Sequence, residues 1–212
     1  MNDIKNDLHN KIQFLYSLRN FITDTPVWLS YTNKDLINKS QKYIEFIKPK
    51  GCCKVIDLGC GNGIMLQPYL KITKPENIYG VDMMITNIIQ SRKNLPDVPT
   101  NNFSVNDIIN YNFVGKYDII IMHGVIGLVE PNKQQFILNK LCKMLHKNGT
   151  LILGAINFVS DAYIFQTYPF ANLKYIRKLC KKYNMNYSLY PDSDFDNTGK
   201  YNAHTLIIRK LN

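Results

Sequence analysis

The chain has 212 residues, of which 45% are hydrophobic, and it carries a formal net charge of +10. This length predicts one domain with its own core, and no apolar run reaches the roughly eighteen residues of a membrane span. The first residues lack the plan of a signal peptide and the five cysteines lack C-x-x-C spacing, so we expect a cytoplasmic protein with free thiols, without a disulfide framework or zinc site.

Two helices are predicted before the first strand. Apolar residues at helical spacing predict an amphipathic helix at the N-terminus (Ile4, Leu8, Ile12, Leu15, Leu18, Ile22). A break at residues 25–28 precedes a second helix, which we expect to begin with Asn33 as its N-cap and to end at Ile47.

The most informative segment runs from Val55 to Gly63 and reads V-I-D-L-G-C-G-N-G. A short apolar run followed by glycines at alternate positions predicts a buried strand that enters a tight turn, where the backbone passes close to a ligand. A dinucleotide fingerprint would need glycine in place of Ile64, and a Walker A loop would need Gly-Lys-Ser/Thr. The pattern therefore excludes both of these loops.

The next strands also end in acidic residues. Residues 78–82 form an apolar run that ends at Asp82, where a carboxylate can accept hydrogen bonds from the hydroxyls of a ribose. Residues 103–107 form a shorter run that ends at Asp107. A strand follows at 117–123.

Strands and helices continue to alternate to the end of the chain. A helix is predicted over 133–145, ending before Gly149, and its apolar face is expected to hold Phe136, Ile137, Leu141, Met144 and Leu145. A strand at 150–155, a helix at 173–183 and strands at 186–190 and 204–210 follow. This alternation predicts a parallel sheet with helices on both faces.

The segment 55–63 resembles motif I of the class I S-adenosylmethionine-dependent methyltransferases, and the resemblance covers residues 36–210. It implies an α/β, Rossmann-like fold with a seven-stranded, mostly parallel sheet, in which the last strand inserts antiparallel next to its predecessor. Residues 51–212 would form this core. Residues 1–50 would supply helices that cap the cofactor and acceptor pocket.

The resemblance also implies how S-adenosylmethionine is held as the cofactor. The glycines would let the backbone approach its amino-acid end, Asp57 would organise its ammonium, and Asp82 would bind its ribose. Met83 would pack on the adenine, whose edge Asp107 and the Ile108 amide would read. The full expected set is Asp57, Gly59, Cys60, Gly61, Asn62, Gly63, Asp82, Met83, Asp107, Ile108, Met122 and His123.

His123 is the candidate general base, because it ends a predicted strand beside the expected methyl position. The alternative is that this position only contacts the cofactor. The strand is not followed by the (Asp/Asn)-Pro-Pro-(Tyr/Phe) site of base-amine methylation or by a nucleophilic cysteine. The acidic loop at 192–196 lacks the glycine and glutamate of a calcium loop, so no metal site is expected.

Two aromatic segments are candidates for acceptor binding. Trp28 and Tyr31 lie between the two N-terminal helices, and residues 156–173 contain Phe158, Tyr163 and Tyr168 among other aromatics. Loops at the carboxyl ends of strands build the ligand site in open α/β sheets. Ordinary packing is the alternative for both segments.

The positive charge does not by itself predict a nucleic-acid partner. Its densest patch, over 174–182, has helical spacing opposite apolar residues, which is typical of a solvated helix face. We expect S-adenosylmethionine-dependent methyl transfer to a small polar acceptor, at oxygen, with a sugar or an activated cell-surface precursor as the hypothesis and a homodimer as an option. An RNA methyltransferase and a non-catalytic adenosylmethionine-binding subunit are the alternatives.

Overall fold

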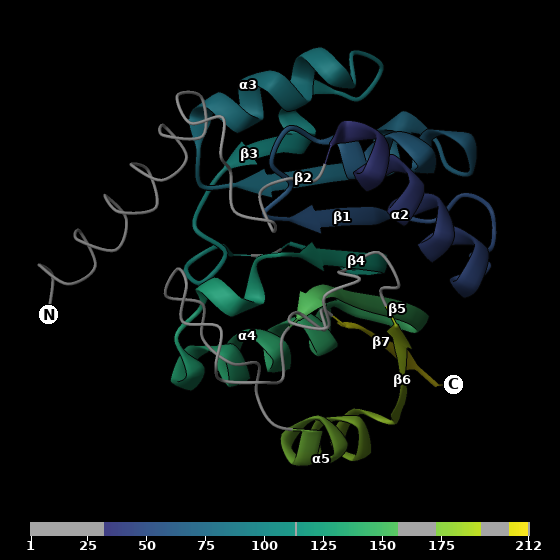
Figure 1. Ribbon diagram of the computed structural model, residues 1–212, viewed down its shortest axis with the longest axis vertical. Coiled ribbons are helices and arrows are strands. Elements are labelled where there is room, and N and C mark those ends of the chain that lie inside the picture. The colour runs from purple at the N-terminus through teal and green to yellow at the C-terminus, as the bar shows by residue number, and fades with distance from the viewer. Residues whose placement is uncertain (1–31, 113, 157–172, 192–203, 212) are drawn as a thin grey trace, which may run out of the picture.

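The structure is a computed structural model that describes residues 32–112, 114–156, 173–191 and 204–211. In these residues seven strands form one sheet in the order β3-β2-β1-β4-β5-β7-β6 (Figure 1). The strands are β1 (Val55–Leu58), β2 (Ile78–Asp82), β3 (Phe103–Val105), β4 (Tyr117–His123), β5 (Leu145–Ile156), β6 (Met185–Pro191) and β7 (His204–Lys210). The expected α/β, Rossmann-like architecture is confirmed.

β7 inserts between β5 and β6 and runs antiparallel to both. The other neighbouring pairs, from β3 to β5, are parallel. The antiparallel insertion of the last strand is thus confirmed. Because parallel strands end at the same edge, the loops after β1, β2 and β4 meet there.

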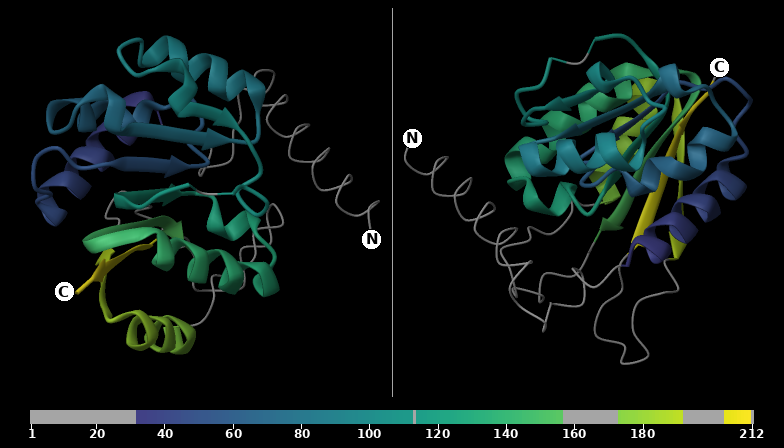
Figure 2. Two further views of the ribbon diagram at one scale, coloured as in Figure 1. Left: turned by 180° about the vertical axis from the view of Figure 1, so that it is seen from behind. Right: turned by 90° about the horizontal axis from the view of Figure 1, so that it is seen from above.

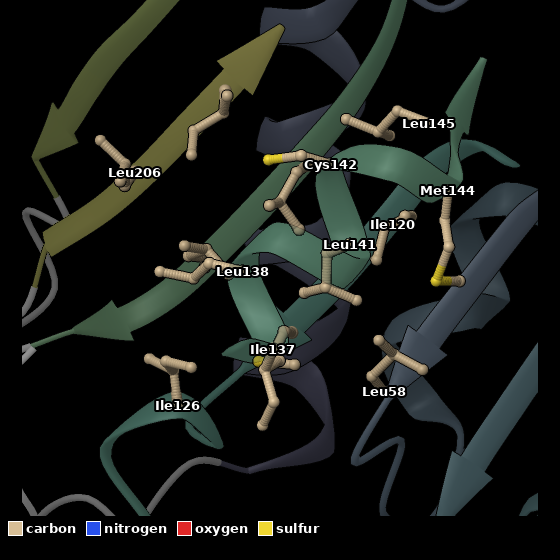
Figure 3. Packing of buried hydrophobic residues seen from close by; sticks show 14 of the residues in the cluster. Leu58, Ile120, Ile126, Ile137, Leu138, Leu141, Cys142, Met144, Leu145 and Leu206 are labelled. Atoms are coloured by element: carbon tan, nitrogen blue, oxygen red, sulfur yellow. The ribbon is translucent and has the colours of Figure 1, made fainter. Parts of the chain in front are cut away.

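One face of the sheet is covered by α4 (Pro131–Met144) and α5 (Leu173–Tyr183). Side chains of α4 at helical spacing, including Ile137, Leu138 and Leu141, pack onto residues of β4, β5 and β7 (Figure 3). These side chains are fully buried. The helix α4 is therefore packed firmly against this face of the sheet.

The opposite face is covered by α2 (Asn33–Ile47), η2 (Ile64–Lys71) and α3 (Ile85–Asn94), so helices lie on both faces (Figure 2). Tyr43 and Ile47 of α2 join the buried cluster on this face. Ser40 donates a hydrogen bond to the carbonyl of Met65 at 2.6 Å, which ties α2 to η2. The remaining short helices are η3 (Pro75–Asn77), η4 (Thr100–Asn102) and η5 (Ile126–Leu128).

The start of α2 differs from the expectation. Thr32, and not Asn33, is the N-cap, and it forms a capping box with Asp35. Thr32 Oγ1 accepts a hydrogen bond from the Asp35 amide, and the Asp35 carboxylate accepts one from the Thr32 amide. A threonine followed three residues later by an acid is a capping-box pattern, so the sequence contained this signal.

Two expectations for α4 were wrong. Phe136 is 57% exposed and faces away from the core, because the buried stripe passes through Gln134, Ile137, Leu138, Leu141 and Cys142 instead. The helix ends at Met144, and β5 begins directly at Leu145, so Gly149 is no helix cap. Asn148 takes the left-handed conformation there.

Residues 1–31 lie outside the described residues, so the division into capping helices and a core stays a prediction. No helix in the described ranges is long and apolar enough to cross a membrane.

Candidate functional site

β1 and β4 are neighbours at the centre of the sheet, and their loops meet at its carboxyl edge. Residues 59–63, here called the glycine loop, leave β1 with positive φ at Gly59, Gly61 and Gly63. The amides of Gly59 and Cys60 donate hydrogen bonds to the carbonyl of Val81, at 2.7 and 3.0 Å. These bonds anchor the start of the loop to β2. Strand order reverses between β1 and β4, which is where open α/β sheets bind ligands.

The glycines of this loop serve two different purposes. A Cβ at Gly59 would overlap the side chain of Val125, which belongs to the loop after β4. A Cβ at Gly61 would meet no atom of the described residues within 4 Å. Gly59 therefore lets two loops pack together, whereas Gly61 borders open space where a ligand can approach the backbone.

Asp57 of β1 lies beneath the glycine loop and is 2% exposed. Its Oδ1 has no hydrogen-bond partner within the described part of the chain. Burial, and to a lesser degree the nearby Asp82, raise the pKa of Asp57 to about 8. A buried carboxylate without a partner is costly, so this atom fits a group that a bound ligand would donate.

Asp82 ends β2 and is largely engaged with the chain itself. Its Oδ2 accepts a hydrogen bond from the Gly61 amide at 2.9 Å. Its Oδ1 accepts from the Met84 amide at 2.9 Å and from Asn87 Nδ2 at 3.1 Å. A carboxylate offers about four acceptor sites. Asp82 therefore holds the glycine loop in place and keeps capacity for one further donor.

The residues expected around an adenine follow β2 and β3. Met83 is partly buried directly after Asp82. Asp107 accepts hydrogen bonds from the Ile109 amide and from Asn110 Nδ2, each at 2.9 Å, and so closes a turn. The Ile108 side chain belongs to the buried core. Only its backbone can therefore face a ligand.

Three more expected residues point their side chains elsewhere. Cys60 and Met122 are buried at 6% and 0% exposure, so either can contact a ligand only through its backbone. Asn62 donates from Nδ2 to Asn33 Oδ1 at 3.1 Å. This contact links the glycine loop to the first turn of α2.

His123 belongs to a cluster that the sequence did not predict. Tyr43 OH of α2 lies 3.2 Å from His123 Nδ1 and 2.9 Å from Thr205 Oγ1 of β7. Lys39, one turn earlier on α2, is 2% exposed, and its charge acts on the imidazole. We call Lys39, Tyr43, His123 and Thr205 the imidazole cluster.

Gly154 of β5 makes room for this cluster. It pairs with His123 across the sheet, and a Cβ on it would overlap His123 Nδ1 and lie 2.8 Å from Tyr43 OH. β5 bulges immediately afterwards, between Leu153 and Ile156, where Ala155 has a φ of 53°. The sequence contained one sign of the imidazole cluster, namely a lysine, Lys39, at a core-facing position of α2 four residues before Tyr43.

Burial, and after it the charge of Lys39, lower the pKa of His123 to about 3. The imidazole is therefore neutral throughout the physiological range. A group whose pKa is lowered in this way is a weak proton acceptor, so the lowered pKa favours a hydrogen-bonding role over the general-base role.

The five expected acceptor residues, Trp28, Tyr31, Phe158, Tyr163 and Tyr168, lie outside the described residues. Within the described ranges, no group of three or more His, Cys, Asp or Glu side chains could hold a metal ion. On the basic face of α5, Arg177 Nε donates to Tyr187 OH at 3.2 Å and Lys182 Nζ to Asn139 Oδ1 at 3.4 Å. These two cations thus bind neighbouring side chains of the same fold.

Known proteins share this chain's sequence pattern and fold. The family model described as a methyltransferase domain matches residues 49–207. The chain is 25% identical over 152 residues to the ubiquinone biosynthesis O-methyltransferase of Pelagibacter ubique, covering 70% of this chain and 59% of that protein. It is 30% identical over 97 residues to malonyl-[acyl-carrier protein] O-methyltransferase 1 of Ilyobacter polytropus, covering 46% and 35%. The chain thus spans less than two thirds of the length of these relatives.

A solved structure is similar over the whole length. Magnesium protoporphyrin IX methyltransferase from Synechocystis, with bound S-adenosylhomocysteine, aligns with a TM-score of 0.71 over 99% of this chain and 100% of that one. The sequence identity is 15%. At that level the likeness concerns the fold.

Proposed function

The chain belongs to the class I S-adenosylmethionine-dependent methyltransferases, and we propose that it transfers a methyl group to an oxygen atom of a small polar acceptor. The observation that carries the proposal is the buried Asp57 Oδ1, which has no hydrogen-bond partner among the described residues and lies beneath a glycine loop bordered by open space. A cationic amino group placed over this loop would satisfy the carboxylate.

The residues at the carboxyl edge fit S-adenosylmethionine. Asp57 would take its ammonium, and the remaining acceptor capacity of Asp82 would take a ribose hydroxyl. The adenine would be surrounded by Met83, Asp107 and the Ile108 amide. Backbone atoms of Cys60, Asn62 and Met122 would also contact the cofactor. When bound, S-adenosylmethionine supplies a methyl group that is already activated by the positive charge on its sulfur. The chain must then align the acceptor and exclude water.

The proposal also concerns the identity of the acceptor. Relatives named for methyl transfer to oxygen support an oxygen acceptor, and a sugar or activated cell-surface precursor is the candidate class. The cytoplasm is the proposed location, and a homodimer the proposed alternative to a monomer. The RNA methyltransferase and non-catalytic alternatives make different predictions, namely salt-sensitive RNA binding and cofactor binding without turnover.

Isothermal titration calorimetry with S-adenosylmethionine and S-adenosylhomocysteine tests the cofactor site. We expect the wild-type protein to bind both, and Asp82→Ala to lose at least about tenfold in affinity, because the carboxylate holds the glycine loop. Asp82→Asn, which keeps the shape, separates loss of charge from loss of packing. Asp97→Ala is the matched control, since Asp97 is an exposed acid elsewhere on the chain.

Failure of the wild-type protein to bind either ligand would contradict the proposal. So would unchanged affinity in Asp82→Ala. Binding without methylation of any acceptor, RNA included, would instead support the non-catalytic alternative.

A further inference from the structure

The imidazole cluster brings together α2, β4 and β7 at the carboxyl edge of the sheet, beside the glycine loop. Val125 packs against Gly59, so His123 lies only two residues from the contact between the two loops. The Gly124 amide donates to the Gly154 carbonyl at 3.0 Å, which fixes the backbone directly after His123. The ring is therefore held at the carboxyl edge of the sheet, beside the packed loops that follow β1 and β4.

Tyr43 OH lies 3.2 Å from His123 Nδ1, so the direction of this hydrogen bond sets which nitrogen of His123 carries the proton. A phenol, with an ordinary pKa of about 10, is a good donor, and a neutral imidazole nitrogen is a good acceptor. Thr205 Oγ1, 2.9 Å from the same hydroxyl, can donate to the phenol oxygen in turn. When the chain of bonds runs from Thr205 to Tyr43 to His123 Nδ1, the proton of the neutral imidazole is on Nε2.

With the proton on Nε2, His123 is a hydrogen-bond donor, and the positive charge of Lys39 acts on its ring. Lys39 is almost fully buried, and it is the one charged group that shifts the pKa of His123 among the residues described. A neutral donor and a buried ammonium stabilise negative charge on a neighbouring oxygen. They do not remove a proton from a hydroxyl.

We infer that the acceptor presents an oxygen that is already ionised, a carboxylate, which Lys39 and the Nε2–H of His123 orient toward the methyl group. The inference rests on the proposed function and narrows its acceptor class: a sugar would be methylated on an acid group and not on a hydroxyl. Tyr43 and Thr205 are positioning residues that hold His123 in the donating tautomer.

The step balances without a base. A lone pair of the carboxylate oxygen forms the new bond to the methyl carbon, and the carbon–sulfur bond breaks with its electron pair remaining on sulfur. The negative acceptor and the positive sulfonium give a neutral methyl ester and a neutral thioether. No proton moves. A hydroxyl acceptor would instead release a proton that needs a base.

Nitrogen NMR of the histidine side chains tests the tautomer without an acceptor. In protein labelled at the imidazole nitrogens, His123→Gln assigns the His123 signals among the four histidines. We expect neutral His123 with the proton on Nε2 from pH 5 to 8, and a mixture of tautomers in Tyr43→Phe. A proton on Nδ1, or protonation of the ring near pH 6.5, would overturn the inference.

A panel of matched acceptors tests the class, each scaffold offered as an acid and as the corresponding alcohol: glucuronate and glucose, benzoate and benzyl alcohol. With methyl-labelled S-adenosylmethionine, a methyl ester releases labelled methanol in alkali, whereas an ether keeps its label. We expect label only on acids, with kcat/KM lowered at least about tenfold in Lys39→Met and largely restored in Lys39→Arg.

Alkali-stable label on an alcohol would overturn the inference while leaving the proposed function intact. If no acceptor of the panel is labelled, the tautomer of His123 decides the inference by itself. Calorimetry with S-adenosylhomocysteine, run on the same preparations, decides separately whether the proposed function holds.

Discussion

The proposed site has two halves, one for the cofactor and one for the acceptor, and they are built in different ways. On the cofactor side, the glycine loop, Asp57 and Asp82 come from two adjacent strands and are joined by backbone hydrogen bonds. On the acceptor side, the imidazole cluster joins residues that are 80 and 162 positions apart in the chain. The first half depends on backbone conformation, whereas the second depends on side-chain packing between distant elements. Mutations should therefore affect the two halves separately.

Replacing glycines within one loop gives the largest expected effect. Gly59→Ala adds a methyl that overlaps Val125 at a φ of +79°, so left-handed strain and overpacking together should cost about 3 kcal/mol of unfolding free energy. Gly61→Ala has the same left-handed strain but open space, and should cost only about 1–2 kcal/mol.

Urea unfolding measures the stability of both variants, and calorimetry their affinity for S-adenosylhomocysteine. We expect Gly61→Ala to lose affinity more than stability, because its methyl enters the space above the loop. Equal losses of stability in the two variants would show that Val125 moves aside easily. The glycine loop and the loop after β4 would then not be firmly packed against each other.

The next largest effect is a pH dependence on the cofactor side. The pKa of Asp57 rises from 3.8 to about 8 in the fold, so between these values the folded protein binds a proton that the unfolded chain does not. The contribution of Asp57 to stability without ligand should therefore be greatest near pH 4 and fall as the pH rises toward 8. Thermal unfolding across this range measures the slope, which Asp57→Asn should reduce. An unchanged slope in that variant would assign the effect to other groups.

His123 should contribute a slope of opposite sign, also of one proton but over a narrower pH range. The pKa of His123 falls from 6.5 to about 3, so below pH 6.5 the unfolded chain binds a proton that the folded protein does not. The contribution of His123 to stability should fall as the pH drops from 6.5 toward 3. His123→Gln should remove this part of the slope and leave the Asp57 part unchanged. Loss of both parts together would mean that the halves titrate as one unit.

The same contrast explains what the sequence could predict. β2, β4, β7 and α5 begin and end where their apolar patterns do. The glycine loop was recognised because nine consecutive residues carry its pattern. Such features are local, and the backbone decides them.

The features that were not predicted depend on contacts across the chain. Nothing near Tyr43 in the sequence indicates Thr205 or His123 as its neighbours, and nothing near Gly154 indicates that an imidazole fills the space above it. Phe136 was placed in the core by hydrophobicity alone, although the neighbouring Gln134 is fully buried and donates to the carbonyls of Ile126 and Val129. Here tertiary hydrogen bonding overrides the apolar pattern.

The smallest expected effect concerns the bond between Asn62 of the glycine loop and Asn33 of α2. Because this bond is exposed, Asn33→Ala should change the unfolding free energy by no more than about 0.5 kcal/mol, like Asn38→Ala, an exposed control on the same helix. Affinity for S-adenosylhomocysteine should fall less than about threefold, since the loop is held mainly by Asp82 and Val81. A loss of tenfold or more in Asn33→Ala alone would mean that α2 orders the glycine loop. The helix that carries Tyr43 would then couple acceptor binding to cofactor binding, and the two halves could not be treated as independent.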